Sequence, residues 1–322
     1  MAAESTTAEV LSKRGDVILH IGEAPRVERK LLVSSVLLGH VSPVFAAMFD
    51  GRFAEGQALT PTAPRVVPLP QDDAEATTII CKIIHTQVAD LSLAITPTQL
   101  ADIAVVCHKY DCVDAVKAWG IIWVAALIHD TSAAGYEKLL FATYLLDLAP
   151  EFKSVSRGFI VNCAEPLSIS AMMNGYDFLP VRLLERIVKE QHDTQMRALA
   201  ALDPIIPATG SVCKNLQNDC DVFMKALRAA RLWPLCTISV EVLMTRLARI
   251  PDSTFWREPC YMSQCPCKTD IRHSGRTLAA TVRDIYRSAK GLCLDCVKRE
   301  ETDVDRRTCR EDCAGDNSLT CD

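Results

Sequence analysis

Apolar and polar residues alternate near the start of the chain, and the spacing then becomes helical. In residues 16–22 (DVILHIG), Val17, Leu19 and Ile21 fall on one side of an extended backbone, which predicts a strand. A second apolar stretch over residues 28–33 follows a turn that contains glycine and proline. We therefore expect these two strands to form a hairpin.

Helical spacing begins directly after this hairpin. Ser34 and Ser35 supply hydroxyl groups that can cap a helix, and apolar residues recur behind them as far as Phe49. Pro43 interrupts this run, and an interior proline removes a helical hydrogen bond, so we expect two short helices. A strand over 66–69 and helices over about 73–85, 97–110 and 113–128 complete an α+β module.

Beyond residue 132 the pattern predicts helices only. They cover about 133–147, 151–162, 168–174, 178–201, 219–230, 239–249 and 275–290. The segment 203–212 contains two prolines and a glycine, which indicates a boundary or a long loop. We therefore divide the chain into a disordered start over 1–14, an α+β domain over 15–130, an all-α extension over 131–250 and a cysteine-rich segment over 251–322.

Composition and motifs restrict the classes of function. The chain is 49% hydrophobic with a net charge of −5, which is typical of a globular protein and argues against nucleic acid as the main partner. The start has no secretory signal, and the longest apolar run is too short to span a membrane. We expect an intracellular protein, cytoplasmic or nuclear, with reduced cysteines.

A search for catalytic motifs finds no dinucleotide loop, Walker A loop, nucleophile elbow or H-E-x-x-H sequence, so we expect no enzyme. The pair Asp72-Asp73 is interpreted as a helix cap. Cys107 and His108 are neighbours, but adjacent side chains on a helix point about 100° apart. They are interpreted as a core cysteine beside a surface histidine.

The cysteine spacing tightens toward the C-terminus. Cys293-x2-Cys296 is typical of one half of a structural zinc site. One hypothesis completes the site with Cys309 and Cys313, although the residues between lack a finger core. The preferred hypothesis adds Cys265 or Cys267 and then Cys309 or Cys313. In the alternative without metal, these residues are reduced thiols in a poorly ordered tail.

The segment Gly15–Gly56 resembles the core of BTB/POZ domains. The resemblance combines Asp-φ-x-φ on the first strand, LLGHVSPVFAAMF on the helices and Leu-Pro-x-Asp-Asp before the next helix, and it continues to about residue 130. More narrowly, the chain resembles a fungal group of BTB proteins that carry a helical extension and a cysteine-bearing segment around LCLDC. In that group the last cysteine motif often ends in histidine, where this chain has Cys313.

The resemblance implies a non-enzymatic interaction protein that forms a homodimer or docks on a partner protein. Phe53 and Glu55 fall where cullin-binding members carry an apolar-x-Glu motif, after the helix that ends in Met48 and Phe49. These four residues are the candidate partner-binding set. In the preferred, simpler interpretation Phe53 packs on its own domain and Glu55 is solvated. Alternative functions are a substrate adaptor of a cullin-type ubiquitin ligase and a transcription or chromatin regulator.

Overall fold

The computed structural model describes residues 7–129, 135–162, 179–200, 224–232, 240–250 and 275–302. Its fold is mixed α+β, as the pattern of strands and helices predicted. Backbone contacts divide the chain into two compact units. Unit 1 comprises Met1–Phe152 and Cys293–Asp322, and unit 2 comprises Lys153–Leu292.

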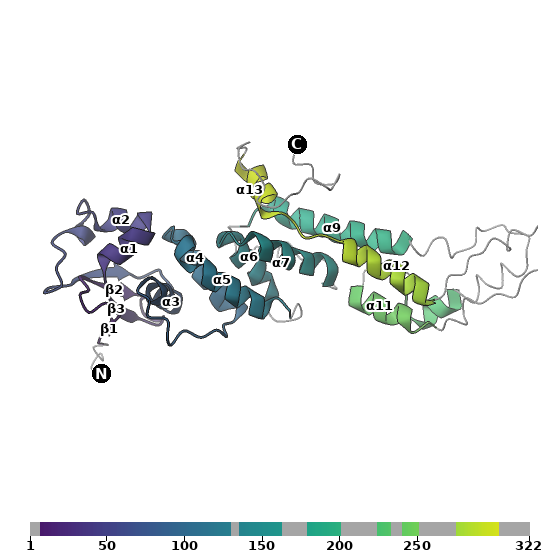
Figure 1. Cartoon of the computed structure of the whole chain (residues 1–322), viewed down its shortest axis with the longest axis horizontal. Coiled ribbons are helices and arrows are strands. Elements are labelled where there is room, and N and C mark those ends of the chain that lie inside the picture. Colours follow the sequence, from purple (N-terminus) through teal and green to yellow (C-terminus); the bar gives the residue numbers. More distant parts are fainter. Residues whose placement is uncertain are drawn as a thin grey trace, which may run out of the picture. The chain divides into compact units, whose positions relative to one another are not determined.

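A four-stranded sheet with the order β1-β3-β2-β4 forms one layer of unit 1 (Figure 1). Strands β2 (Val17–Ile21) and β3 (Arg29–Val33) are antiparallel, and β4 (Arg65–Leu69) runs parallel to β2. Every second side chain of β2 is buried, as its alternation predicted. The structure thus confirms the predicted hairpin and the third predicted strand.

Strand β1 (Glu9–Val10) was not predicted from the sequence. It pairs in parallel with β3, and the following Leu11 is buried. Two residues are too few for an alternating pattern to become visible, so only the pairing with β3 reveals this strand.

Helices α1 (Ser35–Val41) and α2 (Pro43–Phe49) are separate, as the proline predicted. The Ser34 side chain accepts a hydrogen bond from the Leu37 backbone N–H, and Ser42 accepts one from the Phe45 N–H at 3.0 Å. Proline fits the first position of α2 because the N–H of that residue would have no helical partner.

Three helices of unit 1 pack on one another and follow the sequence prediction closely. They are α3 (Ala74–Ile84), α4 (Pro97–Lys109) and α5 (Val113–Leu127). Helix α3 contacts β3 and α4, and α4 also contacts α6 (Tyr136–Leu145). Thr96 and Gln99 form a capping box at the start of α4. The fully buried residues Leu100 and Ile103 place α4 at the centre of the core.

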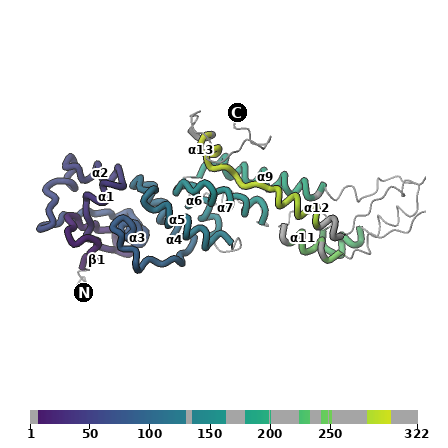
Figure 2. Tube along the Cα trace, in the orientation of Figure 1, coloured from purple at the N-terminus to yellow at the C-terminus, as the bar shows by residue number. Residues whose placement is uncertain are grey.

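Unit 2 is helical in its described parts. The helices are α9 (Val181–Ala200), a short helix over 224–229, α11 (Val240–Ala248) and α12 (Gly275–Ser288). Figure 2 shows α12 lying beside α9 and α11, and Val282 and Tyr286 of α12 are buried. Helix α7 (Ala149–Asn162) begins before the unit boundary and ends within unit 2.

These helices confirm the predictions for 133–147, 151–162, 178–201, 239–249 and 275–290, and part of 219–230. The stretch at 168–174 lies outside the described residues. Helix α13 (Leu294–Thr302) was not predicted, because its first residues were interpreted as a zinc-binding turn.

No helix in the described ranges is long and apolar enough to cross a membrane.

Candidate functional site: the surface of α1, α2 and η1

Large apolar side chains are exposed on the helices that follow the hairpin. Val36 and Leu37 of α1 are 75% and 43% exposed, and Val44 of α2 is also exposed. Helices α1 and α2 pack on each other, and α2 contacts the short helix η1 (Ala54–Gly56). We call Val36, Leu37, Val44 and Phe53 together the α1–α2 surface. Burying one such side chain against a partner would contribute about 1.5–3 kcal/mol.

The loop that carries Phe53 is folded tightly against the end of α2. A side chain at Gly56 would lie 2.8 Å from the Phe49 backbone, so only glycine fits there. Asp50 accepts a hydrogen bond from the Arg52 N–H and pairs with its guanidinium at 2.8 Å. This turn leaves Phe53 56% exposed and Glu55 half-buried. In the simpler interpretation Phe53 packs on its own domain, whereas the structure leaves just over half of this residue exposed.

Met48 and Phe49 are half-buried at the end of α2. The Phe49 ring is parallel to Phe45, with centroids 5.8 Å apart, and Phe45 stacks on Tyr110 at 4.2 Å. The Ser42 hydroxyl donates a hydrogen bond to the Tyr110 carbonyl oxygen at 2.5 Å. This column of rings connects the candidate partner-binding residues of α2 to the end of α4, so α2 has a fixed position.

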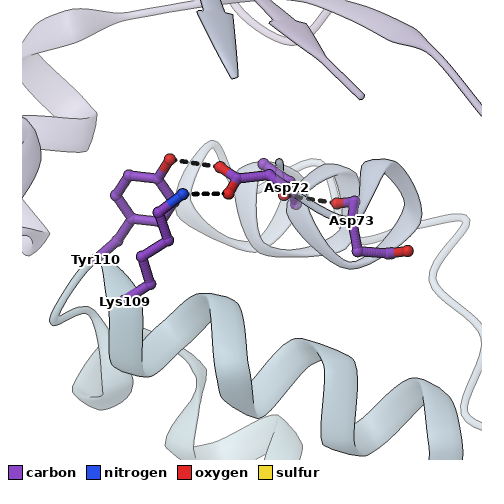
Figure 3. Close-up of polar contacts among 5 residues, drawn as sticks. Asp72, Asp73, Lys109 and Tyr110 are labelled. Atoms are coloured by element: carbon purple, nitrogen blue, oxygen red, sulfur yellow. Dashed lines mark hydrogen bonds and ion pairs between the residues drawn. The ribbon is translucent and has the colours of Figure 1, made fainter. Parts of the chain in front are cut away.

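A buried carboxylate lies at the inner end of this column. Figure 3 shows Lys109 and Tyr110 converging on Asp72. The Tyr110 hydroxyl donates to one carboxylate oxygen, and the Lys109 ammonium pairs with the other. Burial, followed by the hydrogen bond to Asp72, raises the pKa of Tyr110 far above its ordinary value. Tyr110 is therefore a neutral donor at physiological pH.

Asp72 and Asp73 have different roles. Asp73 is the N-cap of α3 and accepts a hydrogen bond from the Ala76 N–H at 2.8 Å, which confirms the cap interpretation for this residue. The Asp72 side chain is only 3% exposed and binds Lys109 and Tyr110 instead. Sequence spacing could not separate the two, since the partners of Asp72 lie 37 and 38 residues away.

The N-terminal end of α1 is held by two residues outside the helix. Asp16 accepts hydrogen bonds from the Ser35 N–H at 2.8 Å and from the Ser35 hydroxyl at 2.6 Å. The His85 Nε2 accepts the Ser34 N–H at 2.9 Å, while Nδ1 donates to the Cys81 carbonyl at 2.8 Å. The exposed residues of α1 are thus presented by a helix whose start is fixed, which reduces the entropy lost on binding.

Protonation of His85 should destabilise unit 1. Burial lowers the pKa of His85 below its ordinary value of about 6.5, and the hydrogen bond to Cys81 opposes this only partly. A proton on Nε2 would also remove the acceptor of the Ser34 N–H. The unfolded chain therefore binds more protons below about pH 6.5, so this stability is present above that pH and is lost as pH falls.

We expect urea midpoints measured from about pH 7.5 down to about pH 5.5 to fall in the wild type and to fall less in a His85→Gln variant. Glutamine supplies an oxygen acceptor and an N–H donor but does not titrate in this range. The matched control is His40→Gln, which replaces an exposed histidine of α1. Equal pH dependence in the wild type and His85→Gln would contradict the assignment.

An open groove of about 810 Å³ lies beside Asp72 and α4. Its lining carries both signs of charge, from Asp73, Glu75 and Asp102 and from the arginines of the β2–β3 hairpin. The pKa of Asp102 is raised, mainly by burial and then by the Asp73 carboxylate. Sites for small organic ligands are mostly apolar with a few polar groups, so this groove does not have their usual character.

The cysteines of α3, α4 and the residue before α5 are core residues. Cys81, Cys107 and Cys112 are buried, whereas His108 is exposed, which confirms the interpretation of the Cys107-His108 pair. Burial raises the pKa of Cys81 to about 12, and the pKa of Cys107 is raised by its hydrogen bond with Cys112 and by burial. The protonated, buried thiols of Cys81 and Cys107 are therefore poor nucleophiles and poor metal ligands.

The zinc hypothesis concerns other cysteines. Cys293 is buried just before α13, and Cys296 is half-buried within its first turn. Cys265, Cys267, Cys309 and Cys313 lie outside the described residues. Within the described ranges no group of three or more potential ligand residues is placed to hold a metal. The two described thiols could supply half of a site, and zinc binding stays a prediction.

The residues that precede α13 are held by contacts that the sequence did not indicate. The Leu292 N–H donates to the Ser156 hydroxyl at 2.9 Å, and Arg157 donates to the carbonyl oxygens of Ala289 and Tyr286. Leu292 and Leu294 are buried. Packing therefore accounts for the leucines of the LCLDC segment. These partners are more than 100 residues apart, so no local signal could have found them.

In unit 1, α13 is attached through Lys298. Its ammonium pairs with Asp147 at 2.9 Å and lies 5.2 Å from the centre of the Tyr144 ring. Asp147 also accepts from Lys117 of α5 at 3.4 Å. The end of the described chain thus contacts residues of the N-terminal half.

No protein-family model matches this sequence. A comparison with curated proteins also finds no match. The class established for the chain is therefore its mixed α+β fold, and its function has to be argued from the surface described above.

Proposed function

We propose that this chain is a non-enzymatic protein–protein interaction module of the BTB/POZ type, which self-associates or docks a partner protein through the α1–α2 surface. The observation that carries the proposal is the exposure of Val36 and Leu37 on a helix whose start is fixed by Asp16 and His85. Apolar side chains held in place on a surface favour burial against another protein.

The surroundings of this surface support an interaction role. The Phe49–Phe45–Tyr110 column fixes α2, and the tight loop at Gly56 fixes η1. The surface therefore loses little conformational freedom when a partner binds. Aromatic and apolar anchors such as Phe53 are also the residue types that contribute most to protein interfaces.

Self-association can be tested by light scattering on the full chain. We expect a dimer in the wild type and a monomer in the Val36→Asp/Leu37→Asp variant, because the introduced carboxylates would have to be desolvated in the interface. The matched control is Leu93→Asp, which places a carboxylate at an exposed leucine of unit 1 outside the surface. A wild-type monomer would redirect the proposal to a different partner protein. A dimer that persists in the double variant would contradict the assigned surface.

A second candidate function is favoured by the exposure of Phe53. As an adaptor for a cullin scaffold, the chain would insert the Phe53 ring into an apolar pocket of the partner and use Glu55 at its rim. The 56% exposure of Phe53 leaves the ring available for such a contact. This geometry supports the adaptor hypothesis more than the sequence did.

The adaptor hypothesis predicts that a Phe53→Ala/Glu55→Ala variant loses capture of a purified cullin scaffold. Loss of a buried aromatic anchor weakens binding by roughly 2 kcal/mol or more. Val36→Asp/Leu37→Asp, measured in the same assay, tells the two parts of the surface apart. Absence of capture by the wild-type chain would remove this candidate and leave self-association to be judged by light scattering.

A further inference from the structure

Unit 2 contains a pocket with a basic lining. Its volume is about 480 Å³, and it is lined by the short helix over 224–229, the residues that follow this helix and the C-terminal end of α11. Three arginines line it, together with alanines of the short helix and Ile250. The described lining residues are Ala226, Ala229, Ala230, Arg231, Arg246, Arg249 and Ile250. None of them is acidic.

Positive charge is concentrated around this pocket although the whole chain is acidic. Residues 224–232 and 240–250 contain five basic residues and a single acidic residue, Glu241, whereas the net charge of the chain is −5. A concave site lined by one sign of charge raises the local concentration of ions of the other sign. The pocket is therefore suited to an anion.

Arg246 has a structural role at the pocket wall. Its Nη1 donates a hydrogen bond to the Arg231 carbonyl oxygen at 2.7 Å. That carbonyl lies in the turn two residues beyond the short helix. The chain turns there through a left-handed residue, since Arg231 has a φ of 55° and the Leu232 N–H returns to the Leu227 carbonyl at 2.7 Å. The pocket wall is thus held by hydrogen bonds.

Arg231 and Arg249 have no such structural role. Both side chains are exposed, and neither makes a hydrogen bond or an ion pair with any residue in the described ranges. Both residues line the pocket beside Arg246. Each offers a planar set of N–H donors that matches the oxygen atoms of a phosphate group. The hydrogen bond to the Arg231 carbonyl accounts for Arg246, whereas the side chains of Arg231 and Arg249 are available to a ligand.

We propose that this pocket binds a small ligand that carries phosphate groups. Arg231 and Arg249 donate to phosphate oxygens, Arg246 adds its charge from the wall, and the alanines contact the rest of the ligand. The volume lies in the range of small-molecule sites, which is about 300–1,000 Å³. A nucleic-acid backbone would need an extended basic stripe, whereas the basic lining here surrounds one concave site.

Titration calorimetry of the full chain with inorganic pyrophosphate, at about 50 mM salt, tests this proposal. We expect saturable binding by the wild type and an affinity about tenfold or more lower for Arg249→Ala, because a hydrogen bond between charged groups is lost. Arg228→Ala is the matched control. It removes the same charge from an exposed residue of the short helix outside the pocket lining and should change the affinity by about twofold at most.

A second variant separates a loss of binding from a loss of folding. Arg231→Gly removes one guanidinium and keeps a residue that readily adopts the left-handed backbone, so the turn is preserved. It should weaken pyrophosphate binding about as much as Arg249→Ala, with unchanged helix content by circular dichroism. Co-sedimentation with phosphatidylcholine vesicles that contain a phosphorylated inositol lipid distinguishes a lipid headgroup from a free ligand. If the ligand is a lipid headgroup, the chain should sediment with these vesicles and pyrophosphate should release it.

Three results would overturn the proposal. The first is the absence of saturable pyrophosphate binding by the wild-type chain. The second is an equal loss in Arg228→Ala and Arg249→Ala, which would show a diffuse charge effect without a site. The third is binding of duplex DNA that pyrophosphate does not compete and that Arg249→Ala does not change.

Discussion

Replacing Gly291 by alanine should destabilise unit 2 by about 3 kcal/mol or more. An added Cβ would lie 1.7 Å from the Lys153 carbonyl oxygen and 2.9 Å from the Ser156 hydroxyl. The first neighbour is backbone of α7, which cannot move without loss of helical hydrogen bonds. The same Ser156 hydroxyl accepts the buried Leu292 N–H, so a shift would also leave that donor without its partner.

Urea unfolding followed by circular dichroism measures this effect. The matched control is Ala280→Ser, which adds one atom at an exposed position of α12 and should change the free energy of unfolding by less than about 0.5 kcal/mol. A cost below about 1 kcal/mol for Gly291→Ala would mean that the segment before α13 is not packed closely on α7.

Replacing Asp72 by alanine should lower the free energy of unfolding by about 2–4 kcal/mol. The change leaves the buried Tyr110 hydroxyl without its acceptor and removes the partner of the Lys109 ammonium. The Lys109 side chain is 48% exposed, so water replaces part of its lost interaction, and the effect stays below that of a fully buried pair.

Asp73→Ala is the informative comparison, because it removes the adjacent carboxylate on the same backbone. It should cost about 1 kcal/mol, the usual value for an N-cap. Thermal or urea unfolding of the two variants gives the difference directly. Adding Tyr110→Phe to Asp72→Ala should recover part of the loss, since no buried hydroxyl then lacks a partner. Equal costs for Asp72→Ala and Asp73→Ala would contradict the assigned roles.

The sequence by itself determined most strands and helices of unit 1 up to residue 128. Alternation marked β2, an apolar stretch after a turn marked β3, and Pro43 separated α1 from α2. These signals act between residues at most four positions apart, so they can be recognised before the fold is known. The candidate partner-binding residues were named from the resemblance to BTB/POZ domains.

The exposure of those residues was decided by the tertiary structure. The sequence favoured a Phe53 packed on its own domain, and the turn closed by Gly56 against α2 leaves it exposed. The different roles of Asp72 and Asp73 likewise depend on where α4 ends relative to α3. Adjacent residues with the same side chain give the sequence no means to separate them.

The contacts between the C-terminal segments and earlier helices were also decided only by the tertiary structure. Arg157 reaches Ala289 across 132 residues, and Lys298 reaches Asp147 across 151. Such pairs form because packed helices bring distant segments together, and no periodicity along the chain records them. The arginine pocket has the same origin, since two helix ends that are ordinary in sequence become one basic site when they pack.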